Sequence, residues 1–243
     1  MDTLASFFDR HSPLHHSEIH AMIRGFPSPI RAIFSCAAFF VALPWMKADD
    51  GDWQQWSEVS ATQTFGYGLD GVLRFQQRWE DDISEYGYHE IEPMVYWRYS
   101  PRWDFAIGYE RDERFEPEAG ASNLATLGAV LKIPLKDWVL TNLFRTEWTV
   151  PESSEDWRTI YKNHTGIQTS WRWGSKELKP YLSDEWSYDI QGGEFFENRL
   201  QIGVGVPIVP HWMASIYFMR LDEKTADGWE WHPVVGVSVQ AQF

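Results

Sequence analysis

The last stretch of the chain, residues 229–243, alternates between apolar and polar side chains. Counting back from Phe243 in steps of two, one face is apolar and ends in Trp231 and Trp229. A period of two is typical of a β-strand, because successive side chains point to opposite sides. An apolar face bounded by aromatics at both ends is what a strand needs to cross a bilayer. The pattern therefore predicts an amphipathic, membrane-spanning strand.

The same alternation recurs upstream in segments that are rich in aromatic residues. Some segments are separated by tight turns and the others by acidic or polar connections. The tight turns recur about every 35 residues, which suits hairpins with strands of about 9–14 residues. We predict strands at residues 53–65, 69–80, 87–99, 103–115, 123–133, 138–150, 157–173, 178–190, 195–206, 212–222 and 229–243.

These segments number eleven, whereas bacterial barrels normally have an even number of strands. Either residues 53–65 lie outside the closed wall, which leaves ten, or two strands have been merged and there are twelve. Segment 157–173 has the weakest alternation, because Asn163, Thr165 and Thr169 interrupt its apolar face. The predicted fold class is all-β, a transmembrane up-and-down antiparallel β-barrel of about 10–12 strands.

An apolar run at residues 32–45 precedes these segments and is shorter than the ~20 residues of a spanning helix. Basic residues precede the run and Ala48 follows it, which is the order of a cleaved secretory signal peptide. Met22 is a more natural start than the first residue. We therefore expect residues 1–48 to be an upstream extension and signal peptide, and residues 49–243 to be the barrel.

Composition narrows the class further. A net charge of −14 and a pI near 4.9 exclude a nucleic-acid partner, which needs a basic face. Fifteen Trp with a mean hydropathy of −0.41 fit a barrel, in which every second residue faces a polar lumen. A soluble β-sandwich with a Trp-rich face is the main competitor. Cys36 is the single cysteine, so no intrachain disulfide forms.

Aromatic residues gather near the ends of the predicted strands, where barrels place them at the two membrane interfaces. If Phe243 is periplasmic, the tight turns are periplasmic and the acidic connections are external. The expected interface aromatics are Trp97, Trp103, Trp138, Trp148, Trp171, Trp186, Trp212, Trp229, Trp231 and Phe243.

The polar faces carry charges of both signs. The interior of such a barrel is small, and buried charges must be paired, so we favour structural ion pairs that pack a narrow lumen. A selective pore is the alternative. The expected lumen network consists of Arg74, Arg78, Arg98, Glu110, Arg145, Glu147, Tyr181, Glu185, Glu197 and Arg199.

His164 is a weak candidate for catalysis. With Asn163 and Ser170 or Ser183 it would suit a phospholipase, and His89 with its neighbour Glu90 would suit a lipid A deacylase. Neither set has a nucleophile in register, and we favour a hydrogen-bonded lumen histidine.

No Cys or His cluster suits zinc. Residues 80–82, or Asp184 with Glu185, have the oxygen ligands of a Ca²⁺ site, but solvated acidic loops are the simpler interpretation. We expect no metal and no cofactor.

Four local phrases resemble a family of proteobacterial secreted proteins that is catalogued only as a domain of unknown function. Its members are expected to be outer-membrane barrels. In that pattern an Arg usually follows the Asn of the second phrase, whereas this chain has His164. The resemblance covers most of residues 53–243 and implies the fold and the compartment, but no activity. The phrases are RFQQR at 74–78, YKNHTG at 161–166, KPYLSDE at 179–185 and ENRLQIGV at 197–204.

Together these observations predict a bacterial outer-membrane barrel that is a narrow channel for small solutes or a structural envelope protein. The alternatives are a barrel enzyme acting on lipids and a soluble periplasmic β-sandwich that binds a ligand. The expected partners are outer-membrane lipids and the barrel insertion machinery. The resemblance to outer-membrane barrels implies that this machinery recognises the strand ending in Phe243.

Overall fold

The computed structural model describes residues 53–115, 120–151, 157–173 and 176–243. The expected signal peptide and the start at Met22 fall within residues 1–48, which lie outside the described residues, so both stay predictions. Within the described part of the chain, no helix has the length and hydrophobicity needed to cross a membrane.

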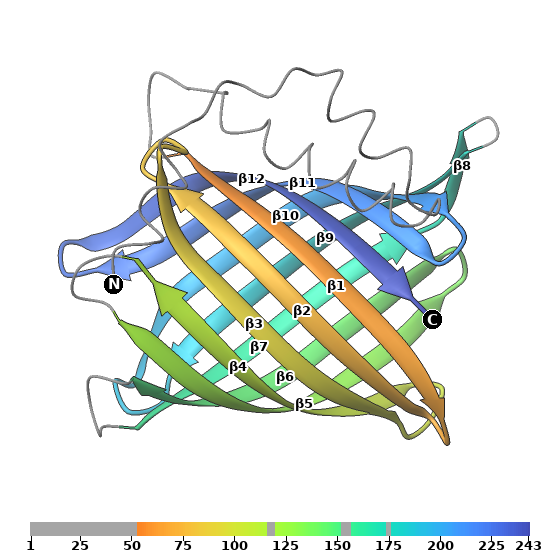
Figure 1. Ribbon diagram of the computed structural model, residues 1–243, viewed down its shortest axis with the longest axis horizontal. Coiled ribbons are helices and arrows are strands. Elements are labelled where there is room, and N and C mark those ends of the chain that lie inside the picture. Colours follow the sequence, from red (N-terminus) through yellow and green to blue (C-terminus); the bar gives the residue numbers. More distant parts are fainter. Residues whose placement is uncertain (1–52, 116–119, 152–156, 174–175) are drawn as a thin grey trace, which may run out of the picture. The chain divides into compact units, whose positions relative to one another are not determined.

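Alternating segments form long strands that are joined in chain order (Figure 1). The strands are β1 (Gln54–Gly66), β2 (Leu69–Glu80), β3 (Glu85–Arg98), β4 (Trp103–Arg114), β5 (Ala121–Leu135), β6 (Trp138–Pro151), β7 (Arg158–Thr169), β8 (Trp171–Trp173), β9 (Lys176–Asp189), β10 (Glu194–Val209), β11 (Trp212–Thr225) and β12 (Gly228–Gln242).

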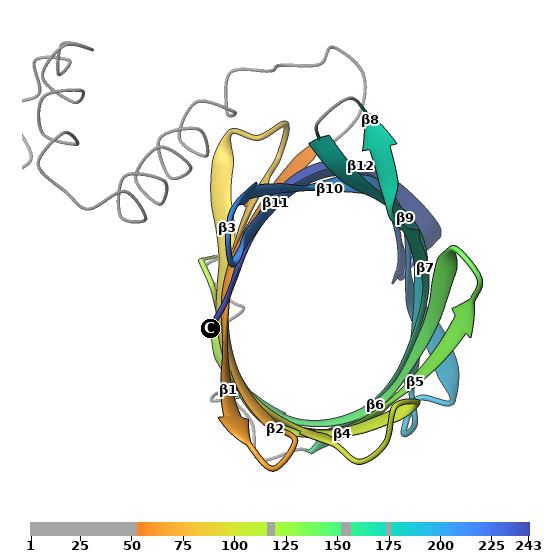
Figure 2. The same cartoon turned by 90° about the vertical axis from the view of Figure 1, so that its right-hand side faces the viewer.

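Eleven of these strands form one closed barrel, which Figure 2 shows as a ring. Each wall strand pairs antiparallel with the next one, from β1 to β12. β7 pairs directly with β9, because β8 stays outside the wall. The predicted up-and-down barrel is therefore confirmed. The alternative of a soluble β-sandwich is wrong, because a single sheet closes on itself rather than forming two packed layers.

The ring closes through a parallel pair of strands. β1 pairs with β12 in parallel over nine residue pairs, from Gln54 opposite Val234 to Thr62 opposite Gln242. Strand direction alternates around an up-and-down sheet, so the first and the eleventh wall strands must run the same way. Neither way of restoring an even number holds for the wall. Residues 53–65 belong to it, and although two strands had been merged and the chain has twelve, the additional strand β8 is not part of the wall.

The predicted segment 157–173 forms two strands, of which only the first spans the wall. β7 ends at Thr169, and the three residues of β8 pair with the start of β9 as an extension of the hairpin. Two of the polar residues that weaken its alternation, Asn163 and Thr165, bond to Asn142 on the outer face, and the Thr169 hydroxyl donates to the backbone carbonyl of Asp137. Asn142 Nδ2 on β6 donates to Asn163 Oδ1 at 3.2 Å and to Thr165 Oγ1 at 2.6 Å.

The two ends of the barrel differ. The tight turns at 66–68, 99–102 and 136–137 lie at one end with Phe243, and we call it the turn rim. The connections at 81–84 and 190–193 lie at the opposite end, the loop rim, with the start of β1.

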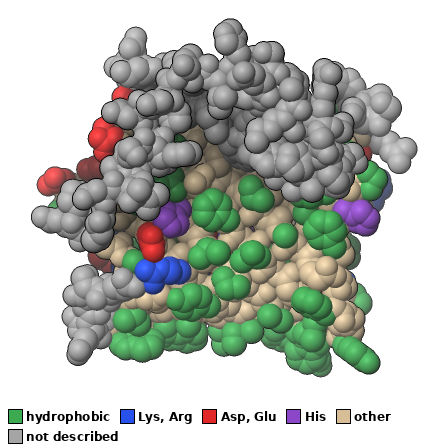
Figure 3. All heavy atoms as spheres, in the orientation of Figure 1, with side chains coloured by type: hydrophobic (Ala, Val, Ile, Leu, Met, Phe, Trp, Pro, Cys, Tyr) green, Lys and Arg blue, Asp and Glu red, His purple; other side chains and the backbone are tan. Residues whose placement is uncertain are grey.

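The outer face of the wall is apolar. Side chains such as Ile107 and Ile202, each at least 60 % exposed, point away from the lumen, and Figure 3 shows mostly hydrophobic side chains on the visible wall. This is the surface of a barrel that faces lipid. By strand position, six of the expected interface aromatics lie near the turn rim and four near the loop rim. The turn-rim set is Trp97, Trp103, Trp138, Trp171, Trp212 and Phe243, and the loop-rim set is Trp148, Trp186, Trp229 and Trp231.

A small apolar core fills one side of the lumen. Trp56 on β1 packs against Met219 and Leu221 on β11 and Val234 on β12, and all four side chains are at most 3 % exposed. Burying a tryptophan contributes more than any other apolar contact available to this strand. The core thus helps to hold β1 in the wall, next to its parallel partner β12.

The parallel closure predicts a specific cross-link. Ser60 lies opposite Gln240 in the β1–β12 register, and both line the lumen. In a chain carrying Cys36→Ser, the pair Ser60→Cys and Gln240→Cys is expected to form a disulfide, detectable by its gel mobility without reductant.

The matched control combines Thr62→Cys with Ser238→Cys, which are offset by four residues in the same register. That offset separates the Cα atoms by about 13 Å, which is too far for a disulfide. A barrel in which β1 lay outside the wall would give no cross-link for either pair.

Candidate lumen site

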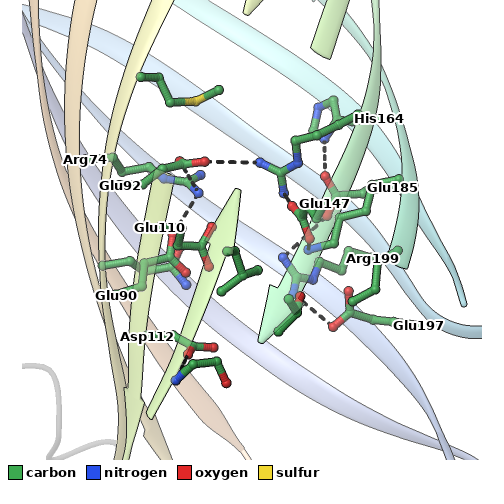
Figure 4. A pocket seen from close by; sticks show the side chains of 18 of the residues that line it. Arg74, Glu90, Glu92, Glu110, Asp112, Glu147, His164, Glu185, Glu197 and Arg199 are labelled. Carbon is green, nitrogen blue, oxygen red and sulfur yellow. Dashed lines mark hydrogen bonds and ion pairs between the residues drawn. The ribbon is translucent and has the colours of Figure 1, made fainter. Parts of the chain in front are cut away.

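Most of the buried charge of the barrel lies on its inward face. Every second residue of each strand lines the lumen, and the charged ones meet near its middle (Figure 4). We call this set the charge belt; it consists of Glu58, Arg74, Arg78, Glu90, Glu92, Glu110, Arg145, Glu147, Lys162, His164, Glu185, Glu197 and Arg199.

Arg74 on β2 holds two carboxylates of β3. Its Nη2 atom lies 2.7 Å from Glu90 Oε1 and 2.6 Å from Glu92 Oε2. The Tyr88 hydroxyl donates a further hydrogen bond to Glu90 Oε2 at 2.9 Å. Both glutamates are at most 3 % exposed, and charges taken out of water need such partners.

Arg145 on β6 reaches across the lumen to the same cluster. Its Nη1 atom lies 3.5 Å from Glu92 Oε1, and its Nη2 atom lies 2.7 Å from Glu147 Oε1. Strands β4 and β5 lie between β3 and β6, and their inward positions here include Gly108 and Gly128. A Cβ atom at Gly108 would lie 2.8 Å from Met94 Cγ and one at Gly128 would lie 3.3 Å from Leu143 Cδ1, so these glycines give room to neighbouring lumen side chains.

The opposite wall carries a second set of ion pairs. Glu147 is fully buried and also lies 3.1 Å from Lys162 Nζ on β7. Arg199 on β10 lies 2.9 Å from Glu197 Oε2 and 3.4 Å from Glu185 Oε1 on β9. These pairs link β6, β7, β9 and β10 through their side chains, in addition to the backbone ladder.

Trp56 joins the two sets. The guanidinium carbon of Arg78 lies 3.8 Å from the Trp56 ring centroid, and that of Arg199 lies 5.0 Å from it. Such cation–π contacts are each worth roughly 0.5–2 kcal/mol. A single residue of β1 therefore fixes two arginines from different parts of the wall.

Three cavities follow one another along the lumen. The loop-side chamber has a volume of about 630 Å³, the middle chamber about 430 Å³ and the turn-side chamber about 530 Å³. The middle and turn-side chambers share Met213 and Gln240. The loop-side and middle chambers share five lining residues, and we call this set the constriction: Arg74, Gln76, His164, Glu185 and Arg199.

His164 lies at this constriction and faces the lumen, away from lipid. Its Nδ1 atom lies 3.4 Å from Glu185 Oε2. Ser183 is on the neighbouring strand, but among the described residues no hydrogen bond joins His164 to a serine. Ser170 is six residues further along the chain, roughly 20 Å away in an extended strand. The histidine therefore has a carboxylate partner and no bonded nucleophile.

The acidic pair considered for Ca²⁺ is divided between the two faces of β9. Glu185 points into the lumen, whereas Asp184 Oδ2 accepts a hydrogen bond from Trp186 Nε1 at 2.6 Å on the outer face. The two carboxylates cannot share one ion. At the loop rim, Asp82 Oδ1 accepts a hydrogen bond from the backbone N–H of Trp53 at 3.3 Å.

The structure places eight of the ten expected lumen residues within the charge belt. Tyr181 lies beside it in the middle chamber, where its hydroxyl accepts a hydrogen bond from Gln201 Nε2 at 2.7 Å. Arg98 is separate: it pairs with Asp70 at 3.0 Å near the turn rim.

Two lumen residues on β1 were missed. Trp56 and Glu58 face inward with Ser60 and Thr62, in steps of two. The opposite face carries Ser, Val, Ala and Gln, so both faces of this strand are mixed and the pattern did not orient it. The only signal in the sequence for the inward face was the large Trp56, which precedes Glu58, Ser60 and Thr62 on the same face.

Glu110 on β4 is the exception within the belt. It is 6 % exposed, and within the described residues it has no hydrogen bond and no ion pair with another side chain. The belt contains seven carboxylates and five permanent cations, so it carries two uncompensated negative charges when His164 is neutral. At the loop-side mouth, Asp112 and Arg114 add one charge of each sign.

An apolar outer wall around a lumen packed with ion pairs defines the class: a closed, membrane-type β-barrel with a polar interior. The chain belongs to the family described as "Protein of unknown function (DUF2490)", whose model matches residues 53–232. This confirms the expected membership of a family known only as a domain of unknown function.

Among solved structures, the chain is similar to a NanC porin in a rhombohedral crystal form. The two are 9 % identical with a TM-score of 0.44, and the match covers 71 % of this chain and 88 % of that chain. A comparison with curated proteins gave no match.

The belt predicts that loss of one buried carboxylate destabilises the barrel. Glu147→Gln keeps the side chain's shape but leaves Arg145 and Lys162 without their shared partner. Removing one member of a buried ion pair typically costs about 3–5 kcal/mol. The expected result is a lower urea midpoint for unfolding of the refolded barrel.

The matched control is Glu85→Gln, at an exposed position at the start of β3. An exposed substitution of this kind changes stability by about 0.5 kcal/mol or less. Equal midpoints for the two variants would show that the belt does not stabilise the fold.

Proposed function

We propose that this protein is an outer-membrane barrel that acts as a narrow channel for small solutes. The observation that carries the proposal is the series of three chambers along the lumen: the loop-side and middle chambers are lined mainly by polar side chains, and the turn-side chamber by both polar and apolar ones. A barrel that served only as a structural wall would have no need of consecutive polar spaces between its two rims.

The constriction sets the size of the solutes. Arg74, His164, Glu185 and Arg199 surround the point where the loop-side and middle chambers meet. Cations and anions there compensate one another, so the passage suits small hydrated or zwitterionic solutes rather than a large acidic chain. A pore for acidic sugars would require an excess of Arg and Lys.

The proposed location is the bacterial outer membrane, with lipids around the apolar wall. The apolar outer face and the aromatic residues near both rims support this location. We also propose that the insertion machinery recognises β12, which ends beside Phe243. Fractionation of cells, with heat-modifiability of the folded barrel on a gel, tests the location; recovery in the soluble periplasmic fraction would contradict it.

The channel predicts stepwise currents from the purified, refolded protein in a planar bilayer. The expected conductance is small, because charged side chains narrow the lumen at the constriction. Conductance no greater than that of a protein-free bilayer would leave only the structural role.

A variant at the constriction makes the test specific. His164→Ala shortens a side chain that lines both the loop-side and the middle chamber and is expected to raise the unitary conductance. The control is Asn163→Ala, one residue away on the outer face of β7, where the conductance should stay at the wild-type value. The same His164→Ala protein also tests the lipid-acting alternative, since lost lipase activity would favour that enzyme over the channel.

A further inference from the structure

The loop-side chamber contains three carboxylates that converge from two adjacent strands. Glu90 and Glu92 on β3 and Glu110 on β4 each offer one oxygen, and these oxygens lie within 4.8 Å of one another (Figure 4). All three side chains are at most 6 % exposed. Like charges at this separation repel strongly unless a cation lies between them.

Arginine neutralises only part of this cluster. Arg74 contacts Glu90 and Glu92, Arg78 lies 3.7 Å from Glu90, and Arg145 approaches Glu92 from across the lumen. Glu110 receives none of these guanidinium groups, and among the described side chains no donor or cation lies within bonding distance of it. An ionised carboxylate buried in this way costs several kcal/mol. Glu110 is therefore the one carboxylate of this cluster without a cation in contact, among the side chains that the structure describes.

We propose that Glu110, together with Glu90 and Glu92, binds a divalent cation of the Ca²⁺ class in the loop-side chamber. Carboxylate oxygens are the ligands of hard cations, and the cluster offers no sulfur or nitrogen ligand of the kind that zinc prefers. The chamber of about 630 Å³ leaves space for the waters that complete the coordination.

The arginines do not exclude such an ion. Each carboxylate has about four lone-pair positions, so Glu90 and Glu92 can face Arg74 and still contribute an oxygen on the side of Glu110. A divalent ion also compensates the two excess negative charges of the belt. The proposal concerns a site within the lumen and holds whether or not the barrel conducts.

The test uses the full-length barrel, refolded in detergent and freed of metal with a chelator. Tb³⁺, a luminescent probe for Ca²⁺ sites, is titrated under excitation of the aromatic side chains. Tyr88 donates a hydrogen bond to Glu90, so an aromatic ring lies next to the bound ion. The expected result is saturable luminescence at one site per chain that added Ca²⁺ displaces.

Glu110→Gln is expected to weaken Ca²⁺ competition by at least roughly tenfold, because it removes one charged ligand. The matched control is Glu85→Gln, which changes an exposed carboxylate at the start of β3 outside the charge belt and should stay within about twofold of wild type. Heat-modifiability on a gel establishes that both variants are folded.

Two outcomes would overturn the site. Wild-type protein that shows no saturable Tb³⁺ luminescence does not bind an ion there. Equal displacement curves for wild type and Glu110→Gln would place the ion elsewhere. A further measurement needs no probe: Ca²⁺ should raise the urea midpoint of wild type and of Glu85→Gln but not that of Glu110→Gln. A calcium-independent midpoint in all three, with Glu110→Gln more stable than wild type, would show that a proton occupies the site instead.

Discussion

The whole architecture depends on backbone hydrogen bonding in a medium without water. A sheet that crosses a bilayer must leave no unpaired edge, because each unsatisfied backbone group costs several kcal/mol there. Eleven wall strands meet this requirement only through a parallel pair, since alternation gives the first and last strands the same direction. Parallel pairing is slightly weaker per residue. The apolar core around Trp56 lies next to this pair and adds contacts that the backbone ladder lacks.

Closure then determines the chemistry of the interior. A narrow ring brings charged side chains from non-adjacent strands within reach, and Arg145 on β6 meets Glu92 on β3 across the two intervening strands. Most charges in the belt are compensated in this way and stiffen the lumen. Among the described side chains, Glu110 has no such partner. A compensated charge packs the barrel, whereas an uncompensated one is available to a ligand. Asking of each buried charge whether it has a partner of opposite sign therefore divides a polar interior into structural and functional residues.

Much of the fold was predictable from alternation alone, because lipid on one side and a polar lumen on the other impose a strict period of two. The segment 103–115 corresponds to β4 at Trp103–Arg114, and the expected inward arginines and glutamates do face the lumen. The orientation of β1 was not predictable, since its two faces are similarly mixed. The partners of the charges were not predictable either. They depend on the stagger between strands and on reach across the lumen, and neither is encoded in local sequence.

The odd number of wall strands has a topological consequence for the ends of the sheet. Trp53 lies at the loop rim, where its carbonyl accepts a hydrogen bond from Ile83, whereas Phe243 lies at the turn rim beside Thr64. In an even-stranded barrel these two ends would lie on the same side of the membrane, and a short linker would join them. Here a circular permutant would need a connection along the full length of a strand, on the order of ten residues or more when extended. A fusion ahead of β1 and a fusion behind β12 would for the same reason emerge on opposite sides of the bilayer.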